Sequence, residues 1–156
     1  MIRIGFGFDT HRLEPGHALR MGGVSIGHSK GAIGHSDADV LIHAVIDALL
    51  GAAGLPDIGQ QFPDTSDDYK GIDSSLLLKQ TLFLLSEKGF SIGNIDCTVV
   101  LQQPKIAAMI PAMISSLSGT LGIDPGLISV KAKTSEKLGF ISREEGVSAY
   151  AVALLT

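Results

Sequence analysis

The sequence predicts a single α/β domain of the α+β type, with a mixed sheet of about five strands covered by about three helices. A length of 156 residues suits one domain spanning 1–156, since domains commonly hold about 100 to 200 residues. Segments with strand and helix periodicity alternate along the chain, and the strand-helix-strand order indicates that part of the sheet is parallel. Gly and Pro separate these segments, and no repeat, low-complexity tract or linker divides them.

Two stretches near the N-terminus predict strands. Residues 2–9 alternate Ile or Phe with Arg, Gly or Asp, and this period of two is typical of a strand. The turn-rich stretch 14–34 is expected to hold short strands around Leu19 and Val24.

The first helix is expected to begin after Ser36, whose hydroxyl suits an N-cap. Asp37 and Asp39 would then lie in the first turn, where negative charge favours the helix dipole. Apolar side chains recur at helical spacing as far as Gly51 or Gly54.

A second helix and a strand follow. The polar loop 57–66 separates the first helix from a helix over 74–88, and Gly89 is placed to end it. Residues 92–101 are apolar enough to predict a buried strand.

The C-terminal third predicts one helix and two strands. Pro104 ends the preceding strand, and Pro111 suits the first turn of a helix that runs to about Leu121. Residues 127–133 and 146–155 then predict the last two strands.

The composition excludes several classes of protein. No apolar stretch reaches the ~20 residues of a membrane helix, so no membrane partner is expected. Twelve basic and 16 acidic residues give a net charge of −4 without a Lys/Arg cluster, which argues against nucleic-acid binding. The single Cys97 excludes an intrachain disulfide and a Cys-based zinc cluster, fits a reducing compartment, and is expected to pack within its apolar strand.

The N-terminus opens on strand-like alternation rather than on a basic and then apolar segment, which favours a cytosolic enzyme or binding protein. The mean hydropathy of +0.33 is high for so small a domain. We therefore expect other subunits to cover part of its apolar surface.

Asp9 and His11 are the sharpest local signal. Residues two apart in a strand project from the same face, and His43 on the first helix would supply a third ligand. Two nitrogens and one oxygen suit a catalytic zinc site with an open fourth position. The alternative is a solvated strand end and a hydrogen-bonded helix histidine, since Asp-x-His pairs are common.

His43 also shares one stripe of its helix with Asp39 and Asp47, four residues to either side. Asp47 is placed to accept the second ring N–H of a metal-bound His43. An exposed Asp-His pair of little energetic weight is the alternative.

Two further segments suit phosphate. His35 and Ser36 precede the expected first helix, whose free N–H groups would attract an anion, although Ser36 would serve equally as a simple cap. The segment 131–136 ends a strand with two cations, two hydroxyls and a carboxylate, a set suited to phosphate and hydrated magnesium, or alternatively to a strand end with an N-cap. Gly5-Phe-Gly-Phe8 lacks the third glycine and the following helix of a dinucleotide-binding site. His17 and His28 lie in turn-like sequence with no partner residue in register, so no role is assigned to them.

Five motifs together are more specific than any one of them. In chain order they are Gly5-Phe-Gly-Phe-Asp-Thr-His-Arg12, Gly34-His-Ser-Asp-Ala-Asp-Val-Leu-Ile-His43, Asp57-Ile-Gly59, Phe62-Pro-Asp-Thr65 and Lys133-Thr-Ser-Glu-Lys-Leu-Gly-Phe140. This set, which spans essentially the whole chain, closely resembles the 2-C-methyl-D-erythritol 2,4-cyclodiphosphate synthases of the non-mevalonate isoprenoid pathway. The resemblance implies that 4-diphosphocytidyl-2-C-methyl-D-erythritol 2-phosphate cyclises with release of CMP.

The resemblance also implies roles for individual residues. Asp9, His11 and His43 would bind zinc, and Glu136 would contact Mg²⁺ or Mn²⁺ on the substrate diphosphate. His35 and Thr134 match the transition-state stabilisers. The other substrate contacts implied are Asp9, His11, His35, Ser36, Asp57, Gly59, Phe62, Pro63, Asp64, Thr65 and Ser66 for the phosphates and methylerythritol, and Leu101, Lys105, Ile106, Ala107, Lys133, Thr134, Ser135 and Glu136 for the nucleotide end.

The resemblance further implies a homotrimer with sites between neighbouring subunits, and a central cavity near Phe140 and Arg143 that takes an isoprenoid diphosphate. Lys133 and Ser135 stand where relatives often have Thr, and Ile141-Ser-Arg-Glu144 replaces the commoner Thr-Gly-Arg-Gly. Glu144 is expected to pair with Arg143 and to oppose a diphosphate there. A pathway of this kind implies a bacterium or a plastid, and the lack of a transit segment favours bacterial cytoplasm.

Two other functions are compatible with these residues. A zinc hydrolase would use the open metal position to activate water, but no motif supplies a convincing Glu-type general base. A non-catalytic trimeric sensor of isoprenoids would keep the pocket without turnover. The complete sets Asp9, His11, His43 and His35, Thr134, Glu136 argue against a sensor, which does not need all six.

Overall fold

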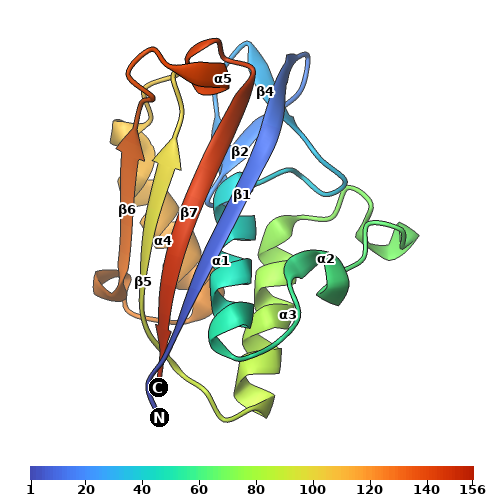
Figure 1. Ribbon diagram of the computed structural model, residues 1–156, viewed down its shortest axis with the longest axis vertical. Coiled ribbons are helices and arrows are strands. Elements are labelled where there is room, and N and C mark those ends of the chain that lie inside the picture. The colour runs from blue at the N-terminus through green and yellow to red at the C-terminus, as the bar shows by residue number, and fades with distance from the viewer.

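A five-stranded mixed sheet is the framework of the computed structural model, which describes residues 1–156 (Figure 1). The strands in spatial order are β4 (Lys30–Ile33), β1 (Arg3–Pro15), β7 (Gly146–Leu155), β5 (Ile92–Val100) and β6 (Ile128–Lys133). Only β5 and β6 run parallel, whereas the other neighbours are antiparallel. The predicted mixed sheet is confirmed.

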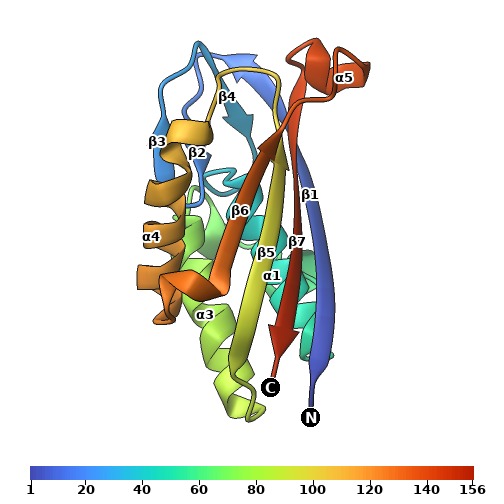
Figure 2. The ribbon, with the colours of Figure 1, turned by 90° about the vertical axis from the view of Figure 1, so that its left-hand side faces the viewer.

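All three long helices pack on one face of this sheet, and the other face carries none (Figure 2). They are α1 (Val40–Ala52), α3 (Ser74–Glu87) and α4 (Ile110–Leu121). The structure adds the short helices α2 (Ile58–Gln61) and α5 (Gly139–Ser142), and the 3₁₀ turns Asp67–Tyr69, Ala107–Met109 and Pro125–Leu127. No helix has the length and apolar character needed to span a membrane.

The predicted short strands form a separate two-stranded sheet, β2 (Leu19–Met21) with β3 (Val24–Ile26). Two strand predictions were incomplete. β1 continues to Pro15 because its last residues pair with β4, which the sequence did not predict. β4 has only four residues in a turn-rich stretch, too few to show a period.

The predicted cap of the first helix was wrong. The N-cap of α1 is Asp39, whose Oδ1 accepts the N–H of Ile42 at 3.0 Å, and no acidic residue lies in the first turn. Ser36 instead lies in the preceding turn, where Oγ accepts the N–H of Ala38 at 3.3 Å. His35 and Ser36 therefore do not flank a free helix N-terminus.

Gly5 and Gly7 allow α1 to lie directly against β1. A Cβ at Gly5 would come within 1.9 Å of the carbonyl oxygen of Ala48, and a Cβ at Gly7 would come equally near that of Ala44. The two glycines thus serve close helix-strand packing rather than a nucleotide loop. Asp9 lies on the same face of β1 as these two glycines, so its side chain lies next to α1.

The opposite face of β1 and β7 is apolar and exposed. Ile4, Phe6 and Phe8 remain 69%, 63% and 46% exposed, and Tyr150 and Val152 continue the same surface. Phe8 and Tyr150 lie with their ring centroids 5.2 Å apart. A contiguous apolar surface of this kind is typical of a protein interface.

Candidate active site

Asp9, His11 and His43 meet at the junction of β1 and α1, as predicted. Asp9 Oδ2 lies 3.0 Å from both His11 Nε2 and His43 Nδ1, and the two nitrogens are 3.2 Å apart. Close packing of α1 on β1 brings His43, one turn after the cap of α1, to the two strand residues.

This triangle fits a tetrahedral divalent metal ion. Ligand atoms about 2.0 to 2.1 Å from zinc, at tetrahedral angles, lie about 3.3 Å apart, close to the three separations observed. Two imidazole nitrogens and one carboxylate oxygen converge from half-buried side chains, and together they are a possible metal site. Three such ligands would leave a fourth position open, as in catalytic sites.

The electrostatics of Asp9 favour its charged form. Burial opposes ionisation, but the hydrogen bonds and charges of His11 and His43 outweigh it and lower the pKa of Asp9 to about 2. The carboxylate is therefore ionised at neutral pH, as a metal ligand must be.

The predicted partner of His43 was wrong. Asp47 accepts the N–H of Ile58 at 2.8 Å and thereby ties α2 to α1. His43 Nε2 instead faces two hydroxyls, Ser36 Oγ at 3.0 Å and Ser74 Oγ at 2.9 Å. Asp47 points elsewhere because α2 supplies a free backbone N–H, which periodicity along α1 does not reveal.

A pocket of about 290 Å³ opens beside the triad. It contains six of the 11 residues predicted for the phosphates and methylerythritol, together with His43 and three apolar or aromatic residues that were not predicted. The lining is His11, His35, Ser36, His43, Ile58, Gly59, Phe62, Asp64, Tyr69 and Leu77. Tyr69 packs edge-on against Phe62 with ring centroids 5.7 Å apart. The only sequence signal for Tyr69 as a pocket residue was that it is an aromatic residue in a polar segment.

The other loop residues predicted for this end lie around the pocket rather than on its wall. Asp57 caps α2, accepting the N–H of Gln60 at 2.9 Å, and this bond and the Gln60 side chain lower its pKa. Ser66 O lies 3.3 Å from His35 Nε2. Pro63 and Thr65 belong to the same loop but do not line the pocket.

The residues predicted for the nucleotide end gather in a second pocket, of about 130 Å³. Its lining is Leu101, Pro104, Lys105, Ile106, Ala107, Ala132, Lys133 and Thr134. Leu101 N donates to the Lys133 carbonyl at 2.9 Å and joins the ends of β5 and β6.

Ser135 and Glu136 lie next to this pocket but outside its wall. Thr134 Oγ1 donates to Glu136 Oε1 at 2.9 Å, and Ser135 Oγ donates to the Leu138 carbonyl at 2.7 Å. Glu136 has a left-handed backbone, with φ 51°, and its side chain is exposed.

The two pockets share no residue. β1, which carries Asp9 and His11, and β6, which leads to Thr134, are separated by β7 and β5. Three strand spacings amount to about 14 Å, so the two pockets lie apart on one chain.

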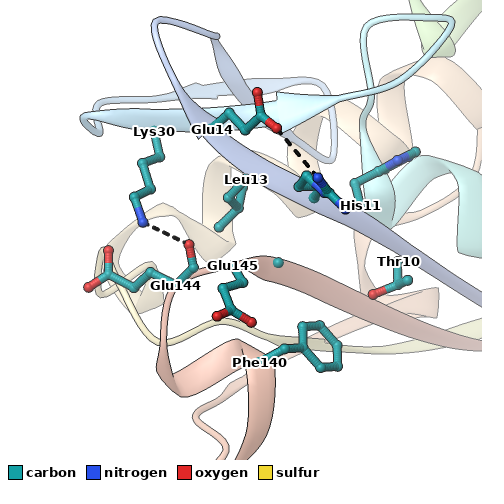
Figure 3. Close-up of a pocket in the computed structure, with 10 residues that line it drawn as sticks. Thr10, His11, Leu13, Glu14, Lys30, Phe140, Glu144 and Glu145 are labelled. Atoms are coloured by element: carbon teal, nitrogen blue, oxygen red, sulfur yellow. Dashed lines mark hydrogen bonds and ion pairs between the residues drawn. The ribbon is translucent and has the colours of Figure 1, made fainter.

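A third cavity, of about 560 Å³, lies where β1 meets the loop that precedes β7 (Figure 3). Phe140 lines it with Glu14, Lys30, Glu144 and other residues, whereas Arg143 does not.

The expected partner of Arg143 was wrong. Arg143 pairs with Glu145, Nε to Oε1 at 2.8 Å and a second nitrogen to Oε2 at 2.9 Å, and this pairing raises the pKa of Arg143. Glu144 turns toward His28, at 3.4 Å, and its carbonyl accepts from Lys30 at 2.9 Å. The left-handed backbone of Glu144, φ 54°, accompanies this orientation away from Arg143.

Cys97 is buried in β5, and burial raises the pKa of its thiol to about 12. Its burial confirms the prediction that it packs in the core, and a protonated buried thiol is a poor nucleophile.

Comparison with known proteins gives one consistent family. The profile of the YgbB family matches residues 2–156. The 2-C-methyl-D-erythritol 2,4-cyclodiphosphate synthase of Bacteroides thetaiotaomicron is 56% identical over 154 residues, covering 99% of this chain and 97% of its own. That of Porphyromonas gingivalis is 58% identical, covering 99% and 95%.

Solved structures agree. The bifunctional IspDF of Campylobacter jejuni superimposes with a TM-score of 0.95 at 44% identity, covering 99% of this chain and 42% of that longer one. A 2C-methyl-D-erythritol-2,4-cyclodiphosphate synthase in its CDP-bound form superimposes with a TM-score of 0.91 at 38% identity, covering 99% and 100%.

Proposed function

Because this chain belongs to the YgbB family, we propose that it performs the reaction of its relatives, the 2-C-methyl-D-erythritol 2,4-cyclodiphosphate synthases. It converts 4-diphosphocytidyl-2-C-methyl-D-erythritol 2-phosphate to the 2,4-cyclodiphosphate and CMP, in isoprenoid precursor biosynthesis. The observation that carries the proposal is the Asp9, His11 and His43 triad beside a pocket lined by His35 and Ser36.

The reaction exchanges one phosphate bond for another. An oxygen of the 2-phosphate bonds to the β-phosphorus, and the bond from that phosphorus to the bridging oxygen breaks, so CMP leaves with that oxygen. The reaction consumes no water and needs no oxidant or reductant. The protein therefore contributes mainly orientation and stabilisation of developing negative charge.

Asp9, His11 and His43 would hold the metal ion, for which we propose zinc. When bound, it supplies Lewis acidity and a fixed point that aligns the diphosphate. His35, on the wall of the same pocket, is positioned to donate a hydrogen bond to a phosphoryl oxygen, as is the hydroxyl of Ser36.

The smaller pocket would take the cytidine. The CDP-bound relative supports this assignment because it shows that the fold holds a cytidine diphosphate. Lys133 and Thr134 line this pocket and would lie between the base and the phosphates, and Glu136, hydrogen-bonded to Thr134, would contact Mg²⁺ or Mn²⁺ on the diphosphate.

A complete site would need two chains. One substrate must reach both pockets, and the two are on different parts of one protomer. We therefore place the reaction between neighbouring subunits of a homotrimer, with the exposed apolar face of β1 and β7 turned inward.

The cavity near Phe140 would adjoin the centre of this trimer and take an isoprenoid diphosphate. In the single chain the guanidinium of Arg143 is hydrogen-bonded to the carboxylate of Glu145. An incoming diphosphate would have to replace that carboxylate. The chemistry and the bacterial relatives point to the bacterial cytoplasm as the place of action.

Incubation with the cytidylyl substrate tests the activity. The expected products are CMP and the cyclic diphosphate, and CMP release should require both zinc and magnesium. A linear phosphate product would indicate the zinc hydrolase instead. Substrate binding without turnover, unchanged in an Asp9→Ala variant, would indicate a sensor.

Elemental analysis of protein purified without chelator tests the metal ligands. We expect about one zinc per chain, and its loss in a His43→Ala variant. The control is His17→Ala, since His17 lies in a turn away from the triad and should keep the metal. Unchanged zinc in His43→Ala would remove His43 from the ligand set.

A further inference from the structure

Behind His43, on the side away from Asp9 and His11, lies a buried polar network. His43 presents Nδ1 to Asp9 Oδ2 at 3.0 Å and Nε2 to Ser74 Oγ at 2.9 Å. Ser74, the first residue of α3, is fully buried, and the His43 side chain is 12% exposed. The ring is thus held between two elements that are distant in sequence.

Asp37 completes this network. Ser74 Oγ hydrogen-bonds to Asp37 Oδ1, and the backbone N–H of Ser74 donates to Oδ2 at 3.1 Å. The N–H of Asp39 donates to Oδ1 at 3.2 Å, and Arg20 Nε lies 3.6 Å from Oδ2. Both carboxylate oxygens of Asp37 therefore act as hydrogen-bond acceptors.

The direction of the hydrogen bonds follows from these contacts. Ser74 Oγ is the donor to Asp37 Oδ1, so its hydroxyl proton points to Asp37. The remaining lone pairs of Ser74 Oγ then face His43 Nε2, which must donate. A neutral His43 accordingly carries its proton on Nε2 and leaves an unprotonated Nδ1 facing Asp9 and His11.

We propose that Ser74 and Asp37 are positioning residues that hold His43 in the tautomer and orientation a metal ligand requires. The inference rests on the proposed metal site and adds to it the side chains that prepare one ligand. Metal-bound histidines commonly give their second N–H to such a partner, and loss of the partner typically lowers metal affinity about 10- to 100-fold.

Ser36 is the competing partner, at 3.0 Å from His43 Nε2. Its hydroxyl accepts from Ala38 N and lies 3.5 Å from Ser74 Oγ, but no carboxylate accepts its proton. Ser36 therefore does not impose a direction on the hydrogen bond, and it lines the substrate pocket instead.

Zinc affinity, measured by competition with a chromophoric chelator, tests the proposal on the full-length protein. Ser74→Ala is expected to weaken zinc binding about 10- to 100-fold, and Asp37→Asn to weaken it in the same direction. Ser74→Thr, which restores the hydroxyl, should recover affinity. Ser86→Ala, the same substitution at the exposed end of α3, should bind zinc as the parent does.

The ¹⁵N shifts of the His43 ring in metal-free protein give a second readout, independent of activity. The parent should show protonation on Nε2, and Ser74→Ala should show a mixture of tautomers. Thermal melting of the metal-free variants separates this effect from a general loss of folding.

Parental zinc affinity in folded Ser74→Ala, or a parent His43 protonated on Nδ1, would overturn the proposal. A parent that binds zinc and shows Nε2 protonation but releases no CMP would contradict the proposed activity alone. A parent that binds no zinc would contradict the metal site and this inference together.

Discussion

Among single residues, Asp39 connects α1 to the small sheet formed by β2 and β3. Its buried carboxylate accepts three backbone N–H groups, from Gly22 at 2.8 Å, Gly23 at 2.7 Å and Ile42 at 3.0 Å. Burial raises the pKa of Asp39, and these three donors oppose the increase. Asp39 therefore fixes both the start of α1 and the turn between β2 and β3.

Replacing Asp39 by Ala should cost about 3 kcal/mol in the free energy of unfolding, because three buried donors lose their acceptor. Urea denaturation of the metal-free protein measures this. Asp124→Ala removes an exposed cap that holds only Gly126 N, at 2.7 Å, and should cost less than about 1 kcal/mol. Equal losses for the two variants would contradict the connecting role of Asp39.

Among elements, the contact between β1 and α1 determines where the triad forms. Helix and strand touch through Gly5, Gly7, Ala44 and Ala48, with no side chain larger than a methyl group between them. Asp9 and His11 follow on the same face of β1. A wider separation of the two elements would move His43 away from both.

Gly7→Ala should therefore destabilise the protein by about 3 kcal/mol and lower its zinc content, since the new Cβ would meet Ala44 O at 1.9 Å. Gly51→Ala is the matched control within α1. Nothing lies within 4 Å of a Cβ there, so this change should be neutral or stabilising by up to about 1 kcal/mol. Thermal melting and metal analysis report both effects, and a Gly7→Ala protein with parental melting and zinc content would refute the close-contact argument.

At the scale of the whole molecule, association between chains would explain both the exposed apolar face of β1 and β7 and the separation of the two pockets. Ile4, Phe6 and Phe8 point away from the core although all three are large apolar residues. The residues predicted for the two ends of a substrate lie at separate pockets. Association through this face would bury the apolar surface and bring pockets of different chains together.

Light scattering should accordingly give three times the 16.3 kDa chain mass. Phe6→Glu places a charge on the apolar face and should lower both the mass and the rate of CMP release. Phe83→Glu is the matched control, since Phe83 is also 63% exposed but lies on α3, away from that face. A stable, active monomer would contradict the interfacial site.

Most elements and the triad were predictable because their signals are local. A period of two or of helical spacing identified β1, β5, β7 and the long helices, and the spacing of Asp9 and His11 placed both on one face. The partners of His43 and Arg143 were not predictable in this way. Ser74 lies 31 residues from His43, and the choice between Glu144 and Glu145 depended on the backbone of one loop.

The sequence by itself determined the family, the succession of strands and helices, and the residue types of a phosphate and metal site, because each is recorded in neighbouring residues or ordered motifs. Only the tertiary structure decided that Asp39 caps α1, that Ser74 and Asp37 stand behind His43, and that the predicted substrate residues lie at two separate pockets. These features depend on how β1, α1 and α3 pack, and contacts between distant segments leave no period in the sequence.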